Sequence, residues 1–329
     1  MPPTRLLSLA GLPLAALLLS ACGTSDTESG AAGGDDDVLE VVVGFYPLEF
    51  ATARVAGDLA EVETLTSPGV DPHDVELTPQ AVATVQGADL VVFSSGLQAA
   101  VDDAVADQAP EHHLDVNQAA DLIDTGTVDD HDHGHDEQEH ADDEQTEETR
   151  TEDEQGDVDP HFWLDPQRMA DVSEAIADRL AEVDPDNAPT YEDNAQKLVE
   201  ELTALGDAYA EGLASCEQED MVTTHSAFGY VAVNHGLHQI GITGLTPQAE
   251  PSPARLAEVT QIVTETGVDT IYAEVLLGAD IAETVARETG AEVRMLDPLE
   301  GITDASPGSD YLEVMQANLD TLREGQRCG

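Results

Sequence analysis

Lysine is almost absent from this 329-residue chain: Lys197 is the only one, and lysine and arginine together number 11. A protein that binds nucleic acid through its phosphates needs many such cations, so the sequence predicts no nucleic-acid partner. A Walker-type phosphate loop needs a lysine beside glycines, and no glycine stands near Lys197. The 69 aspartate and glutamate residues bring the formal charge to −58, which favours a cation as the binding partner.

Cysteine is also scarce, with three residues in the chain, and aromatic residues make up only 4%. Apolar residues nevertheless account for 41%, which is enough for a packed core and excludes disorder of the whole chain. The length allows one large domain or two of ordinary size.

The N-terminal segment has the features of an export signal. Arg5 precedes an apolar stretch, Leu6–Ala21, that is too short to span a membrane comfortably. The stretch ends in Leu-Ser-Ala-Cys, which resembles the lipobox of bacterial lipoproteins. That resemblance implies a signal peptide over 1–21, a lipid on Cys22, and anchoring at the outer face of the cytoplasmic membrane. Residues 22–37 are then a flexible tether. An ordinary secretory signal with an incidental cysteine is the alternative.

Two cysteines, Cys216 and Cys328, remain once Cys22 carries the lipid. An exported protein lies in an oxidising location and two thiols allow only one pairing, so we predict a disulfide between them. A bridge that closes a loop of about 110 residues would stabilise the fold by about 4–5 kcal/mol in the chain-entropy treatment. Two unpaired thiols are the alternative.

The body of the chain alternates strands and helices in two series. The first has strands at 38–44 and 89–94 and helices at 78–85 and 97–106. The second has strands at 221–224, 239–243, 270–274 and 292–296 and helices at 228–234, 253–266, 279–289 and 311–322. Between them we expect a helix at 167–183 and a longer one at 188–213. This alternation predicts an α/β fold of two lobes, each with a mostly parallel sheet flanked by helices, joined by one long helix. The expected boundaries are 38–187 for the N-terminal lobe, 188–214 for the linking helix and 215–329 for the C-terminal lobe.

A segment of different composition, 125–156, interrupts the N-terminal lobe. It is almost wholly acidic residues, His, Gln, Thr and Gly, with no aromatic residue, and we expect a disordered insertion. Four of its histidines lie close together: His131, His133, His135 and His140. Alternating His and Asp offer nitrogen and oxygen ligands, which predicts a low-affinity metal-gathering loop. The alternative is a solvated segment whose histidines are incidental.

Three further histidines stand in otherwise ordered segments: His73 in DPHDVELTP, His161 in DPHFWLDP and His225 in TTHSAFGY. Asp297, in LDPLEG, follows the last strand of the second series. Ligands of open α/β sheets bind at the carboxyl ends of strands, where His225 and Asp297 fall. These four contexts, in this order, resemble the zinc-type (cluster A-I) solute-binding lipoproteins of bacterial ABC transporters. The resemblance runs from about residue 38 to the C-terminus, apart from the insertion.

The resemblance implies a metal ion in the cleft between the lobes. His73 and His161 match the family's ligands in the N-terminal lobe, and His225 and Asp297 match those of the C-terminal lobe. In the family, zinc proteins carry His at the position of His225, where manganese and iron proteins carry Glu, and imidazole suits zinc. Some zinc members replace the fourth ligand by water, so water stays an alternative to Asp297. Zinc members often carry a His-rich loop at the place of the insertion, and Glu250 and Glu274 match hinge and cleft-support residues.

The function that the resemblance implies is a monomeric, extracytoplasmic Zn²⁺ receptor that delivers its metal to an ABC membrane permease. A zinc metallochaperone is a further expected partner, and no enzymatic activity is expected. Two alternatives stay open at this point. One is a manganese or iron receptor of the same fold. The other is an exported zinc hydrolase, which would need an open coordination position and a general base, and the HEXXH motif is absent.

Overall fold

The computed structural model describes residues 38–123, 158–247, 250–276 and 278–329, which belong to one unit running from Val38 to Gly329. Cys22, the signal peptide, the tether and the insertion histidines His131, His133, His135 and His140 lie outside the described residues. Among the helices that the structure describes, none combines the length and the apolar character needed to cross a membrane.

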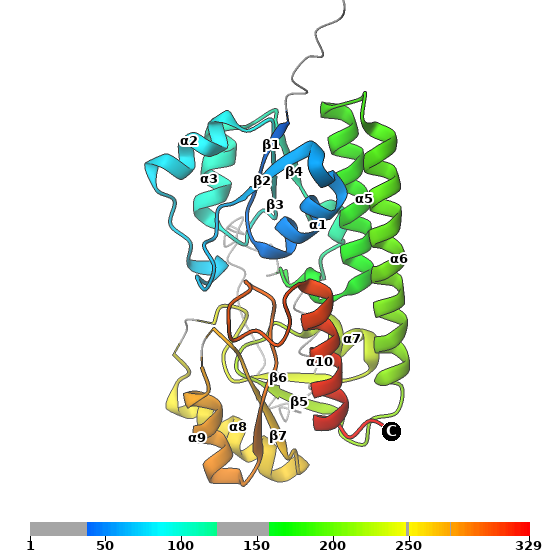
Figure 1. Ribbon diagram of the computed structural model, residues 1–329. Helices are drawn as coiled ribbons and strands as arrows, with labels where there is room; N and C mark the ends of the chain where they lie inside the picture. The colour runs from blue at the N-terminus through cyan, green and yellow to red at the C-terminus, as the bar shows by residue number, and fades with distance from the viewer. Residues whose placement is uncertain (1–37, 124–157, 248–249, 277) are drawn as a thin grey trace, which may run out of the picture. The chain divides into compact units, whose positions relative to one another are not determined.

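The first half contains a parallel four-stranded sheet in the order β2-β1-β3-β4 (Figure 1). Its strands are β1 (Leu39–Val43), β2 (Ala60–Thr64), β3 (Leu90–Phe93) and β4 (His113–Asp115), and its helices are α1 (Tyr46–Ala56), α2 (Pro79–Gly87), α3 (Ala99–Gln108) and α4 (Asn117–Ala120). Short 3₁₀ turns cover Gly57–Leu59, Pro72–Asp74 and Phe162–Leu164. Every residue of β3 is buried, as expected for a central parallel strand.

The second half repeats the same strand order, β6-β5-β7-β8, and is again wholly parallel. Its strands are β5 (Asp220–Thr223), β6 (His238–Gly241), β7 (Thr270–Ala273) and β8 (Glu292–Met295), and its helices are α7 (Gly229–His235), α8 (Pro253–Thr266), α9 (Asp280–Thr289) and α10 (Tyr311–Gly325). In this order the topological switch point lies between β5 and β7, so residues that follow these two strands share one crevice.

Two long antiparallel helices, α5 (Pro166–Val183) and α6 (Ala188–Gly212), pack against each other, and α6 runs along both halves and links them (Figure 1). Helix α6 packs on α1 of the first half and on α10 of the second. Its predicted apolar stripe, Leu198, Leu202, Leu205 and Tyr209, is buried. One continuous apolar cluster contains residues of both halves, from Val41 through Leu198 to Tyr311. Any relative movement of the halves is therefore opposed by a shared core as well as by a rigid helix.

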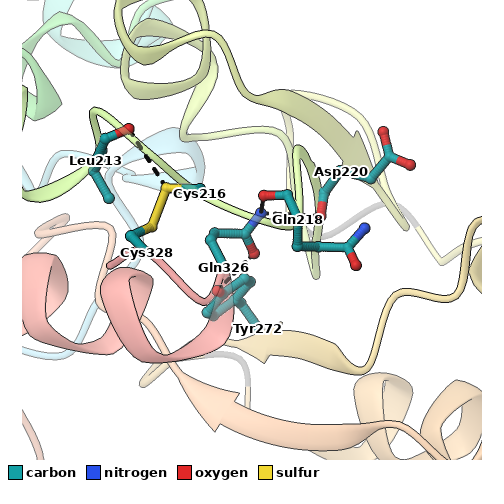
Figure 2. Close-up of a disulfide and its surroundings, with 7 residues drawn as sticks. All are labelled: Leu213, Cys216, Gln218, Asp220, Tyr272, Gln326 and Cys328. Carbon is teal, nitrogen blue, oxygen red and sulfur yellow. Dashed lines mark hydrogen bonds between the residues drawn. A yellow bond between two sulfur atoms is a disulfide. The ribbon is translucent and has the colours of Figure 1, made fainter.

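The predicted disulfide is present: Cys216, just after α6, is bonded to Cys328, just after α10. Figure 2 shows the bridge beside Gln326, whose side-chain amide donates to the carbonyls of Gln218 and Asp220 at 3.0 and 3.1 Å. The hydroxyl of Tyr272 on β7 donates to the Gln326 side-chain oxygen at 2.9 Å. The C-terminus is thus joined both to the end of the linking helix and to the second sheet.

Candidate metal centre

Four side chains from distant parts of the chain each bring one donor atom to the same point. They are His73, His161 and His225, each through Nε2, and Glu300 through Oε1. Nε2 of His161 lies 3.3 Å from that of His73 and 3.4 Å from that of His225. Oε1 of Glu300 lies 3.2, 3.7 and 3.4 Å from Nε2 of His73, His161 and His225 respectively. Donor atoms at the corners of a tetrahedron, each about 2.0–2.1 Å from its centre, are about 3.3 Å apart, so these spacings suit a four-coordinate zinc ion.

The two histidines of the first half, His73 and His161, are positioned by the same local hydrogen bond. Both follow Asp-Pro, and in both cases the aspartate side chain accepts a hydrogen bond from the histidine amide two residues later. Asp71 Oδ1 accepts from the amide of His73 at 2.8 Å, and Asp159 Oδ1 accepts from that of His161 at 2.9 Å. Each histidine therefore lies at a tight turn whose side-chain direction the preceding aspartate helps to fix.

His225 lies at the switch point of the second sheet. It follows β5, and Glu274 follows the neighbouring strand β7. Glu274 Oε1 accepts from the His225 amide at 2.9 Å, and Oε2 lies 2.5 Å from Nδ1 of the His225 ring. Glu274, which the family resemblance marked only as a hinge or cleft-support residue, is thus the carboxylate that orients His225.

His161 has a carboxylate partner of the same kind, since its Nδ1 lies 2.7 Å from Asp159 Oδ1. A carboxylate at Nδ1 favours the tautomer with its proton there, which leaves the Nε2 lone pair of His161 and of His225 free for a metal ion. This carboxylate–histidine pairing is typical of zinc ligands, and sequence inspection did not single out Asp159 for it. The Asp-Pro-His pattern was the available signal.

The cluster is buried, with side chains that are 8% exposed at His73 and fully covered at the other three positions. Neither carboxylate oxygen of Glu300 has a hydrogen-bond partner of good geometry among the described residues, and Oε1 lies within 3.7 Å of all three imidazoles. Burial raises the pKa of Glu300, but the three nearby imidazoles outweigh burial and hold the pKa well below the usual range. Burial lowers the pKa of His225, but Glu274 outweighs it and raises that pKa to about 10. A divalent cation bound here would displace the protons carried by the imidazoles. Its charge would compensate the buried Glu300 carboxylate, whose burial without a partner costs free energy.

Asp297 does not belong to this group, and here the sequence-based assignment is corrected. Asp297 Oδ1 accepts from the Leu299 amide at 2.9 Å, and Leu299 has a φ of +58°, in the left-handed region. The Asn318 side chain makes two hydrogen bonds to the backbone of Asp297: it accepts from the Asp297 amide at 2.9 Å and donates to the Asp297 carbonyl at 2.7 Å. The resulting turn carries the chain on to Glu300, which supplies the carboxylate expected at position 297.

The turn that carries Glu300 is also linked to the His161 segment. The indole Nε1 of Trp163 donates to the Pro298 carbonyl at 2.8 Å, and the Tyr311 hydroxyl donates to the Trp163 carbonyl at 2.6 Å. Throughout the described ranges, no second group of three or more acidic, His or Cys side chains converges in this way. Glu250 is exposed and outside the cluster.

Comparison with known proteins finds that the chain is similar to zinc-uptake and zinc-binding proteins. The family model "ZnuA: Zinc-uptake complex component A periplasmic" matches residues 41–325. The chain is 36% identical to the zinc-binding lipoprotein AdcA of Streptococcus pneumoniae over 94% of its own length, and it spans 59% of that relative. It is 34% identical to the high-affinity zinc uptake system protein ZnuA of Bacillus subtilis, over 94% of this chain and 93% of the relative. The solved structure of the zinc-bound ZnuA-like domain of Streptococcus pneumoniae AdcA aligns with a TM-score of 0.69 and 34% identity, covering 88% of this chain and 98% of the domain.

Proposed function

This chain belongs to the ZnuA family of zinc-uptake components, and on that premise we propose that it is the Zn²⁺ receptor of an ABC importer. The observation that carries the proposal is the convergence of three imidazole nitrogens and one carboxylate oxygen at tetrahedral spacing. The ion is cargo held by His73, His161, His225 and Glu300. Three imidazoles favour zinc over the harder manganese, whose sites are richer in carboxylates.

The ligand arrangement favours a receptor over a hydrolase. A catalytic zinc site keeps one coordination position open for water, whereas these four donors occupy all four positions of a tetrahedron. Two of the ligands, His73 and His161, come from the first half, and His225 and Glu300 come from the second. A small separation of the halves would split the site into two pairs of ligands. A permease that binds the separated state more tightly would thereby lower the affinity for zinc and release it.

We further propose that the mature protein is anchored by a lipid on Cys22 at the outer face of the cytoplasmic membrane. The name of its relative AdcA, a zinc-binding lipoprotein, supports this. The ABC permease is the main partner, and a metallochaperone that loads the site is a second one. A cell that lacks this protein should need added zinc for growth, and the wild-type chain should remove that need where a variant without the metal ligands does not.

The carboxylate ligand can be tested with a matched pair of variants. Glu300→Gln should raise the dissociation constant for zinc by about 10²–10³-fold, since one of four ligands contributes about a quarter of a 10–16 kcal/mol binding free energy. Asp297→Asn keeps an oxygen that can accept from Leu299, so its affinity should stay within a few-fold of wild type. Competition titration against a zinc indicator measures both. If Asp297→Asn costs as much as Glu300→Gln, the assignment of Glu300 as the ligand is wrong.

Deleting residues 125–156 tests the proposed role of the insertion. We expect one tight zinc site to remain and the number of weakly bound zinc ions to fall, because the four tight-site donors all lie outside the deleted segment. Titration of zinc with and without a competing chelator separates the two classes. Disappearance of the tight site would mean that the insertion supplies part of it.

A further inference from the structure

The two chain segments that flank residues 124–157 are joined by a backbone hydrogen bond and by the hydroxyl of one tyrosine. The Asp159 amide donates to the Ile123 carbonyl at 3.0 Å. The Tyr230 hydroxyl accepts from the Ile123 amide at 3.1 Å and donates to the Asp159 carbonyl at 2.6 Å. These three hydrogen bonds close a ring through Ile123, Asp159 and Tyr230, which we call the Tyr230 clasp.

The clasp joins the two halves of the molecule. Ile123 and Asp159 belong to the first half, whereas Tyr230 lies on α7 of the second half, five residues after the metal ligand His225. The Tyr230 side chain is buried, and the guanidinium of Arg168 lies 4.9 Å from its ring centroid. The contact of Arg168 with the Tyr230 ring and the hydrogen bonds of the Tyr230 hydroxyl together fix the position of that hydroxyl.

Asp159 is the link between the clasp and the metal ligand. Its Oδ1 accepts from the amide of His161 and lies 2.7 Å from Nδ1 of the same residue. Its other oxygen lies so close to Gly229 at the start of α7 that a Cβ on Gly229 would be only 2.5 Å away. The backbone and the carboxylate of Asp159 are therefore both placed by the same short stretch of the second half, Gly229 and Tyr230.

We propose that Tyr230 is a positioning residue for the zinc ligand His161 and acts through Asp159; this role rests on the function proposed above. Without the hydroxyl, the Asp159 carbonyl and the Ile123 amide each lose a buried partner, and the backbone at Asp159 gains freedom. The carboxylate then holds the His161 ring less firmly, and zinc dissociates faster. The clasp joins residues on both sides of 124–157 in the sequence, so we expect it to survive the deletion of 125–156 together with the tight site.

Tyr230→Phe is the direct test, because it keeps the ring and its contact with Arg168 and removes only the hydroxyl. We expect the dissociation constant for zinc to rise about tenfold, at the lower end of the effect of changes around a zinc ligand. Gly229→Ala should weaken zinc binding too, by displacing the Asp159 carboxylate while leaving the hydroxyl in place. Bound Co²⁺ gives a second readout, since the visible bands that mark its tetrahedral coordination should shift in both variants.

Tyr209→Phe is the matched control. The Tyr209 hydroxyl is also buried and also donates to a backbone carbonyl, that of Met315, at 2.8 Å, but it takes no part in the metal cluster. Tyr209→Phe should lower the Tm comparably and leave zinc affinity unchanged. If Tyr230→Phe behaves in the same way, its hydroxyl is only structural and the proposal is overturned.

A double variant tests the route through Asp159. Asp159→Asn alone should weaken zinc binding, and adding Tyr230→Phe should weaken it little further, because both changes act on the same group. Fully additive effects would contradict the proposed route. Weak zinc binding by the wild-type chain in the same titration would instead overturn the proposed function.

Discussion

Replacing His73, His161 and His225 together by alanine is expected to abolish tight zinc binding, with a rise of at least about 10⁴-fold in the dissociation constant. Four-ligand zinc sites in small proteins bind with roughly 10–16 kcal/mol, and about 1.4 kcal/mol corresponds to a factor of ten. The triple variant removes three of the four donors and leaves only Glu300. A single buried carboxylate has neither the geometry nor the softness to hold zinc tightly.

The measurement is a competition titration in which a chelator masks weak sites, because the insertion histidines remain in the triple variant. The matched control replaces three histidines outside the cluster, His112, His235 and His238, by alanine. This control removes the same number of imidazoles and should bind zinc as tightly as wild type. Nanomolar affinity in the cluster variant would refute the assignment of the site, and a large loss in the control would show that histidines elsewhere contribute.

The secondary structure could be predicted well wherever the hydrophobic pattern was strong. The helix expected at 253–266 is α8, Pro253–Thr266, and the long helix expected at 188–213 is α6, Ala188–Gly212. The pattern did not predict α1, because seven of its eleven residues are buried and no polar face marks it as a helix. It also did not predict β2, an edge strand whose glutamates alternate with half-buried residues.

The metal cluster was predicted in three of its four members. His73, His161 and His225 stand in distinctive contexts, but LDPLEG offers two carboxylates three residues apart, Asp297 and Glu300. Which of them reaches the cluster depends on the left-handed conformation of Leu299 and on the two hydrogen bonds from the Asn318 side chain to the Asp297 backbone. These are tertiary features, since Asn318 lies 21 residues further along the chain.

The residues that orient the ligands were harder to predict. Glu274 meets His225 only because β5 and β7 are neighbours in the sheet, and the strand order is not visible in the hydrophobic pattern. Tyr230 meets Asp159 across the two halves, 71 residues apart in the chain. Local sequence shows which residue types are able to bind metal, whereas the side chains that hold them in place are chosen by the packing of distant segments.

Removing the disulfide with Cys216→Ser and Cys328→Ser together is expected to lower the free energy of unfolding by about 4–5 kcal/mol, because the bridge restricts the unfolded chain over a loop of more than 100 residues. For a chain of this size that corresponds to a fall in Tm of roughly 10 °C. The folded geometry should persist without the bridge. The Gln326 network and the backbone hydrogen bond from the Gln218 amide to the Gln326 carbonyl, at 3.1 Å, hold the same segments together.

Urea unfolding of metal-free protein measures this loss, because bound zinc would add a stabilisation of its own. Reduced wild-type protein is the matched control and should lose as much stability as the double variant, while reductant should leave the double variant unchanged. Zinc affinity should be equal in all three, since none of the cluster's donors or their carboxylate partners contacts the bridge. Two reactive thiols besides Cys22 in unfolded, unreduced wild-type protein would contradict the bridge itself. Equal unfolding free energies with and without the bridge would refute the predicted stabilisation.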